Sequence, residues 1–203
     1  TFMRKFLLVL MALCLAALPC LAEGAAPAET AAPVETIDYD FGDFTLTFPA
    51  EMPGEIADEI TSGAPFVTLY QMDDLEDAFS SNLNVVWTED ASDLSAADPA
   101  ATAQSIVDGV VASLAQQGIV ATNPTILAAT MDEVGGKPAL SVIYSMDMDY
   151  SGAGVDLQVN VTYIQGIVSE EGLGTYTFTI GTDNINGCQS LIDIVNRSEE
   201  RRV

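Results

Sequence analysis

The sequence predicts an α+β fold in which an antiparallel β-sheet of about six strands is flanked by helices. Strand-like stretches precede a long segment of helical periodicity, a second series of such stretches follows it with short glycine-containing links, and the chain closes on another helical segment. Strands joined by short links pair as antiparallel neighbours. The second series should therefore form a meander on which the helices pack.

Three strands are expected before the long helix. Residues 44–48 alternate apolar and polar side chains and stop at Pro49, which favours a strand leading into a loop. The stretches at 66–70 and 83–87 are also rich in residues that favour strands. The first half of the chain thus supplies the beginning of the sheet.

A helix is predicted between Asp98 and Gly118. Asp98 is a suitable N-cap, Pro99 suits the first helical position, and Gly118 offers a C-terminal stop. Apolar residues recur at helical spacing between these ends and should cover one face of the sheet: Ala103, Ile106, Val107, Val110, Val111 and Leu114.

The second half is predicted to be rich in strands. These are expected near residues 125–131, 139–149, 155–167 and 174–180, with turns at Gly135-Gly136, Ser151-Gly152 and Glu171-Gly172. After Asp183 the helical period returns, and a closing helix should present four side chains on one side: Cys188, Leu191, Ile192 and Val195.

Residues 1–22 have the pattern of a secretory signal peptide. A basic start at Met3-Arg4-Lys5 precedes an apolar run over residues 6–18 and small residues up to Ala22, after which cleavage is expected. The run is short for a membrane span, so a retained anchor is the alternative we do not favour. Lipidation at Cys20 is a second alternative, although Pro19 is not the small residue expected before a lipidated cysteine. Thr1 and Phe2 are expected to lie upstream of the native start.

The remaining chain divides into three parts. Residues 23–36 are rich in Ala, Pro and Glu and are expected to form a flexible tether. Residues 37–198 show regular apolar spacing and are expected to form one domain, and residues 199–203 form a charged tail. No membrane span is expected in the mature chain, which we assign to the secreted or extracytoplasmic space.

Charge and composition exclude several functions. The chain has 30 acidic and 6 basic residues and no histidine, giving a formal net charge of −24 at pH 7. Such a charge repels nucleic acid, and we interpret it mainly as a solvated exterior, with binding of a basic partner as the alternative. The lack of histidine removes Ser-His-Asp chemistry and His-ligated zinc. Cys188, the single cysteine outside the signal peptide, has no histidine partner and is expected to be buried.

Five short motifs in order resemble the PsbP-like domains. They are Phe44-Thr-Leu-Thr-Phe-Pro49, Asn82-Leu-Asn-Val-Val86, Gly135-Gly-Lys-Pro-Ala139, Tyr176-Thr-Phe-Thr179 and Ile194-Val-Asn-Arg-Ser198. The resemblance spans residues 37–198 and rests on the order and spacing of the motifs. It implies an α/β/α sandwich. Its relatives include a thylakoid subunit that supports the oxygen-evolving centre, a Ran-binding import factor and exported bacterial proteins of obscure role. They share no catalytic residue set, and their common theme is docking to protein partners.

One stretch has features of a calcium loop. Asp147, Asp149 and Ser151 followed by Gly152 match the opening of an EF-hand loop, with Asp156 as a further oxygen donor. Position twelve is Gln158 where a bidentate Glu is required, and the flanking sequence reads as strands. We therefore favour a β-hairpin with solvated carboxylates, and weak Ca²⁺ binding is the alternative.

Two further features are interpreted as structural. The acidic cluster at residues 73–77 is expected to be a solvated loop, and Trp87, the only tryptophan, is expected in the core.

The function favoured by the sequence is an exported, non-enzymatic binding domain that docks to an envelope or extracellular protein. Docking through an exposed apolar patch is expected, without a pocket lined by converging carboxylates. The alternatives are a Ca²⁺- or small-ligand-binding module and a carboxylate-dependent hydrolase.

Overall fold

The computed structural model describes residues 35–41, 44–71, 78–91, 93–94, 97–134 and 137–200. The predicted signal peptide, the tether up to residue 34, the acidic cluster at 73–77, the Gly135-Gly136 turn and the last three residues lie outside the described residues. Within the described part, strands, a long helix, a meander and a closing helix follow in the predicted order.

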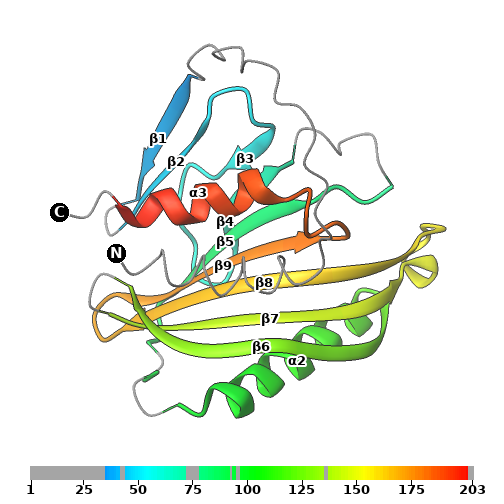
Figure 1. Cartoon of the computed structure of the whole chain (residues 1–203). Helices are drawn as coiled ribbons and strands as arrows, with labels where there is room; N and C mark the ends of the chain where they lie inside the picture. Colours follow the sequence, from blue (N-terminus) through cyan, green and yellow to red (C-terminus); the bar gives the residue numbers. More distant parts are fainter. Residues whose placement is uncertain are drawn as a thin grey trace, which may run out of the picture.

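An antiparallel sheet of seven strands forms the centre of the molecule (Figure 1), in the order β3-β4-β5-β9-β8-β7-β6. Its strands are β3 (Gly54–Ile56), β4 (Pro65–Tyr70), β5 (Asn82–Thr88), β6 (Val120–Val134), β7 (Lys137–Asp149), β8 (Gln158–Glu170) and β9 (Gly174–Thr182). The strands from β6 to β9 form the expected meander, because each pairs with its neighbour in the chain. This confirms the predicted α+β class.

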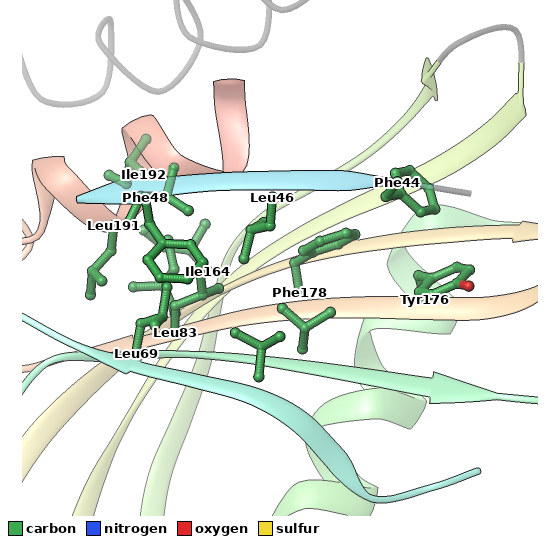
Figure 2. Close-up of a cluster of buried hydrophobic side chains, with 14 of the residues drawn as sticks. Phe44, Leu46, Phe48, Leu69, Leu83, Ile164, Tyr176, Phe178, Leu191 and Ile192 are labelled. Carbon is green, nitrogen blue, oxygen red and sulfur yellow. The ribbon is translucent and has the colours of Figure 1, made fainter. Parts of the chain in front are cut away.

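A separate hairpin and a helix cover one face of the sheet. The strands β1 (Thr36–Asp40) and β2 (Thr45–Pro49) pair only with each other among the described strands. Beside β2 packs α3 (Gln189–Glu200), the closing helix. Figure 2 shows β2 and α3 directing apolar side chains toward the sheet, among them Leu46, Phe48 and Leu191. Leu46 and Leu191 are fully buried, so this layer is part of the core.

The long helix covers the other face. The helix α2 (Pro99–Gln116) begins where predicted, and the side chain of Asp98 accepts hydrogen bonds from the backbone N–H groups of Ala100 and Ala101. Ala103 and Val107 are buried against β6 and β7, together with Leu140, Val142, Tyr144 and Met146. Together with β1, β2 and α3 on the opposite face, α2 completes an α/β/α sandwich.

Several boundaries differ from the expectation. The sheet has seven strands instead of about six, and one of them is the three-residue β3, which was not predicted. The strand predicted at residues 44–48 is present as β2, but it pairs with β1 in a separate two-stranded sheet and not, as expected, at the beginning of the main sheet. β1 was also missed, since its sequence TIDYD is short and acidic. β6 begins at Val120, five residues earlier than expected, and passes through Pro124 at a register shift between Thr122 and Thr125. A proline is tolerated there because β6 is an edge strand.

Candidate functional site

The hairpin of β7 and β8 brings two predicted site residues onto one face of the sheet. Asp147 and Asp149 are two positions apart on β7, so their side chains point to the same side. In the strand register, Asp147 lies opposite Asn160 of β8, and Asp149 lies opposite Gln158. The predicted hairpin is therefore present, and each carboxylate faces an amide side chain across the strands.

These residues line a cavity of about 450 Å³ at the end of the sheet. We call it the tip cavity. Its lining consists of Val120, Thr122, Asp147, Met148, Asp149, Gln158, Val159 and Asn160. The strands β6, β7 and β8 each contribute, so the regular part of the sheet holds most of the lining in place.

Asp147 is held by two amide donors. Nδ2 of Asn123 donates to its Oδ2 at 2.8 Å, and Nδ2 of Asn160 donates to its Oδ1 at 2.8 Å. Asn123 reaches the carboxylate from a left-handed backbone conformation with φ of 51°. Both bonds favour the ionised carboxylate, and they hold the pKa of Asp147 below its ordinary value, with Asn123 as the larger cause.

Asp149 accepts bonds from the start of the connecting turn. The hydroxyl and the backbone N–H of Ser151 both donate to its Oδ1, the N–H at 2.9 Å. On the other side, Nε2 of Gln158 donates to its Oδ2 at 2.9 Å. These bonds lower the pKa of Asp149, the Ser151 hydroxyl contributing most.

The two carboxylates therefore remain ionised at neutral pH. In a strand, side chains that are two positions apart leave the backbone roughly 7 Å from each other. This separation falls within the range that glycoside hydrolases use between the two carboxyl groups of their catalytic pairs. Those enzymes, however, need one carboxyl group with a raised pKa to donate a proton. In Asp147 and Asp149 both pKa values are shifted downward, so neither side chain is suited to act as a general acid.

The four residues suggested as calcium ligands do not all meet. Asp147 and Asp149 line the tip cavity and Ser151 is bonded to Asp149, whereas Asp156 lies exposed between the short helix Ser151–Ala153 and β8 and is not part of the lining. Across the described residues, no group of three or more His, Cys, Asp or Glu side chains is placed to hold a metal ion. The oxygen donors beside the two carboxylates are amides and a hydroxyl.

Sequence reasoning missed the amide side chains of this site. Asn123, Gln158 and Asn160 carry no motif, and only the β6–β7–β8 register brings them beside the two carboxylates. The alternation of polar residues along Gln158-Val-Asn160 was the available signal, because it matches the alternation of Asp147-Met-Asp149 on the facing strand.

Exposed apolar side chains lie near the tip cavity. Val120, at the start of β6, has an exposed fraction of 56%, and Val155, in the segment that leads into β8, has 52%. These are single exposed side chains and do not establish the expected apolar patch, which stays a prediction. The expectation that no pocket would be lined by converging carboxylates was wrong, because Asp147 and Asp149 share one cavity.

Two residues interpreted as structural are held within the fold. Cys188 is buried, and its Sγ donates to the carbonyl oxygen of Ile185. Trp87 is half-buried against the α3 side of the core, and its Nε1 donates to the carbonyl oxygen of Leu173 at 2.9 Å. Both side chains therefore serve packing, as the sequence predicted.

A second cavity of about 470 Å³ lies at the opposite end of the sheet, beside the start of β7. Its lining consists of Ala91, Asp93, Leu94, Pro138, Ser169, Glu170 and Glu171. The hydroxyls of Ser169 and Thr175 lie 2.8 Å apart, and Thr175 in turn donates to the carbonyl oxygen of Asp90. These bonds tie the segment after β5 to β9.

The sandwich described above defines the class of protein: an antiparallel sheet covered on one face by a helix and a β-hairpin and on the other by a single long helix. No protein-family model matches the chain, and no curated protein matches it. Neither helix in the part of the chain that the structure describes combines the length and apolar character of a membrane span.

Within this class, the chain is similar to the solution structure of cyanobacterial PsbP (CyanoP) from Synechocystis sp. PCC 6803. The match has a TM-score of 0.55 at 14% identity and covers 85% of this chain and 96% of that one. A crystal structure of a Pseudomonas aeruginosa protein of unknown function matches at 12% identity over 83% of this chain and 96% of that one, but its TM-score of 0.36 does not establish a shared fold. The chain has a PsbP-like fold, as its sequence motifs implied.

Proposed function

We propose that this protein is an exported, non-enzymatic accessory domain that docks to a protein partner in the envelope or outside the cell. The observation that carries the proposal is the PsbP-like fold, which extends over 85% of the chain. Docking to protein partners is the theme implied by the resemblance described in the sequence analysis. The signal-peptide pattern of residues 1–22 supports an extracytoplasmic location.

The chemistry of the chain supports a binding role over a catalytic one. The sequence has no histidine, and its only cysteine outside the signal-peptide pattern is buried. The carboxylate pair in the tip cavity lacks a proton donor, because hydrogen bonds lower the pKa of both Asp147 and Asp149. A carboxylate-dependent hydrolase would need one of these side chains to be protonated near neutral pH.

Affinity capture tests the docking function. The mature chain from residue 23 is immobilised and exposed to an envelope extract of the source organism, and retained proteins are identified by mass spectrometry. We expect a partner that survives washing at 0.5 M salt and that a second, unrelated acidic protein of similar charge does not retain. Proteins that also bind the matched acidic protein are held by net charge alone, and they are not counted as partners. Retention of the same set of proteins on both columns would contradict the proposal.

A second candidate function is binding of Ca²⁺ or a small cationic ligand in the tip cavity. The observation that favours it is a cavity of about 450 Å³ lined by two ionised carboxylates and by amide and hydroxyl oxygens. Hard divalent cations take such oxygen ligands. The side chains of Asn160 and Gln158 could turn their carbonyl oxygens inward if a cation replaced their present bonds to the carboxylates.

Thermal unfolding tests this second function. A ligand that binds only the folded state raises the melting temperature with its concentration. We expect millimolar CaCl₂ to raise the melting temperature above that in NaCl of equal ionic strength, and Asp149→Ala to remove the difference. Asp156→Ala is the matched control, because Asp156 does not line the cavity. Equal melting temperatures in both salts would exclude calcium from the site.

A further inference from the structure

β6 is a long strand at the edge of the sheet. It spans 15 residues, Val120–Val134, and pairs on one side with β7; among the described residues, no strand pairs with its other side. The opposite edge strand, β3, has only three residues. An unpaired edge presents backbone N–H and C=O groups that another extended chain can pair with. Figure 1 shows β6 as the outermost strand on its side of the sheet.

The two halves of β6 differ in how they are protected against such pairing. The first half contains Asn123 in a left-handed conformation, Pro124, and register shifts between Thr122 and Thr125 and between Ile126 and Ala128. Prolines and bulges of this kind interrupt regular pairing along an edge.

The second half, residues 128–134, has none of these features. Its residues keep an uninterrupted register with β7, from Ala128 opposite Ile143 to Val134 opposite Lys137. It contains no proline, glycine or lysine. Seven residues of strand extend over roughly 23 Å, a length similar to that of an average strand. The regular part of the edge, without proline or bulge, is therefore confined to residues 128–134.

We propose that residues 128–134 receive an extended, basic segment of a partner protein as an eighth strand of the sheet. In this mode of recognition the main-chain hydrogen bonds supply affinity, and alternate side chains supply specificity. The inference deepens the docking function proposed above and rests on it, because it identifies the surface and the chemistry of the partner.

Charge selects the occupant of this edge. The segment has two charged residues, Asp132 and Glu133, and both are acidic. The whole chain carries a formal net charge of −24, so a second copy of it would be repelled, whereas a strand bearing Lys or Arg would be attracted. Thr130 is exposed in this segment, and it offers a side chain for an added strand to contact.

A peptide experiment tests the edge directly. The probe is a capped seven-residue peptide, Lys-Thr-Val-Lys-Val-Thr-Lys, and its control replaces each Lys with Glu. We expect the Lys peptide to slow hydrogen exchange at alternate backbone amides of residues 128–134 by tenfold or more at saturation, since alternate N–H groups of an edge strand point outward. The Glu peptide should leave exchange unchanged. No slowing with the Lys peptide, or equal slowing with both peptides, overturns the proposal.

Two substitutions at one exposed position separate this inference from the docking function. Thr130→Lys places a positive charge beside the added strand and should weaken binding of the Lys peptide at least fivefold. Thr130→Glu should preserve or strengthen it, and both variants should keep the melting temperature of the parent protein. If a captured partner binds Thr130→Lys as tightly as the parent, docking holds but the edge proposal is wrong. If the peptide binds as expected while envelope extracts yield no partner, the docking function fails and the edge site stands.

Discussion

Gly152 lies in the turn between β7 and β8, where its backbone meets the backbone of Gly118 at the end of α2. A Cβ atom on Gly152 would lie 2.3 Å from the carbonyl oxygen of Gly118, and a Cβ on Gly118 would lie 2.9 Å from the carbonyl oxygen of Gly152. Real Cβ atoms do not approach backbone oxygens this closely. The contact therefore requires glycine on both sides, and it attaches the hairpin that forms the tip cavity to the helix on the α2 side of the sheet.

We expect Gly152→Ala to lower the free energy of unfolding by about 1–3 kcal/mol, because the added methyl group must displace one of the two backbones. Chemical denaturation monitored by circular dichroism measures the change. Gly166→Ala is the matched control, since a Cβ there meets no atom within 4 Å and the backbone is not left-handed. Equal stability of the two variants would show that the turn moves without cost.

The amide side chains make a second prediction at the residue scale. Asn123→Ala should raise the pKa of Asp147 toward the ordinary value of about 3.9, and Asn160→Ala should do so by a smaller amount, because Asn123 is the larger cause of the shift. Titration of the carboxyl carbons by NMR measures both. The pKa of Asp149 should not change in either variant, as its donors are Ser151 and Gln158.

The same bonds set a pH dependence. A carboxylate whose pKa is lower in the folded protein than in the unfolded chain stabilises the fold. This contribution is fully present above about pH 3.9, the ordinary pKa of Asp, and it is lost as the pH falls through the pKa of the group in the folded protein. Asp147 is exposed and Asp149 is only half-buried, so this contribution is small. The two asparagine variants should accordingly lose most stability relative to the parent above about pH 3.9, and the difference should disappear as the pH falls below the pKa of Asp147 in the folded protein. An unfolding series between pH 2 and 6 measures this difference, and a difference that does not change with pH would mean that the bonds do not form.

At the scale of elements, α2 combines a favourable start with an unfavourable interior residue. Asp98 caps its first turn, with hydrogen bonds of 3.0 and 3.3 Å to backbone N–H groups. Gly109 lies exposed in the middle of the helix, and a Cβ there would meet no atom within 4 Å. Asp98→Ala should therefore cost about 1 kcal/mol, and Gly109→Ala should gain about 1 kcal/mol. Because the sites lie far apart, the double variant should return close to the parent value, which denaturation measures directly.

The elements also show what the sequence could and could not predict. α2 was predicted because its cap, its first proline, its apolar spacing and its terminal glycine all indicate the same segment. β1 and β3 were missed because short, acidic segments have no periodic signal, and they form strands only because β2 and β4 lie beside them. The start of β6 was missed because a proline inside a strand is unusual, and the register shift at the sheet edge that accommodates Pro124 is visible only in the structure.

The candidate site was predicted in part for a similar reason. Asp147 and Asp149 were identified from the sequence because, with Ser151 and Gly152, they match the opening of an EF-hand loop. Their partners Asn123 and Asn160 lie 24 and 13 residues from Asp147 along the chain, so only the strand pairing reveals them. Asp156 was grouped with the site by sequence distance alone, and the turn places it outside the cavity.

At the scale of the whole molecule, charge balance is the dominant feature. With 30 acidic and only 6 basic residues, most carboxylates cannot have a basic partner, whatever the details of the fold. Repulsion among like charges destabilises a compact state and weakens as salt screens it, since the Debye length falls from about 10 Å at 0.1 M to about 3 Å at 1 M. The folded protein should therefore become more stable as ionic strength rises.

We expect the melting temperature to rise by about 2–4 °C between 0.01 and 0.5 M NaCl, equivalent to roughly 1 kcal/mol for a chain of this length. NaCl and KCl should act equally, because screening depends on ionic strength and not on the identity of the cation. A larger rise in CaCl₂ of the same ionic strength would add specific binding at the tip cavity to the general effect, and Asp149→Ala would remove only that excess. A melting temperature that falls with NaCl would instead mean that the few basic residues form attractive pairs that outweigh the repulsion among the acids, and the net charge could then no longer be used to select a basic partner for β6.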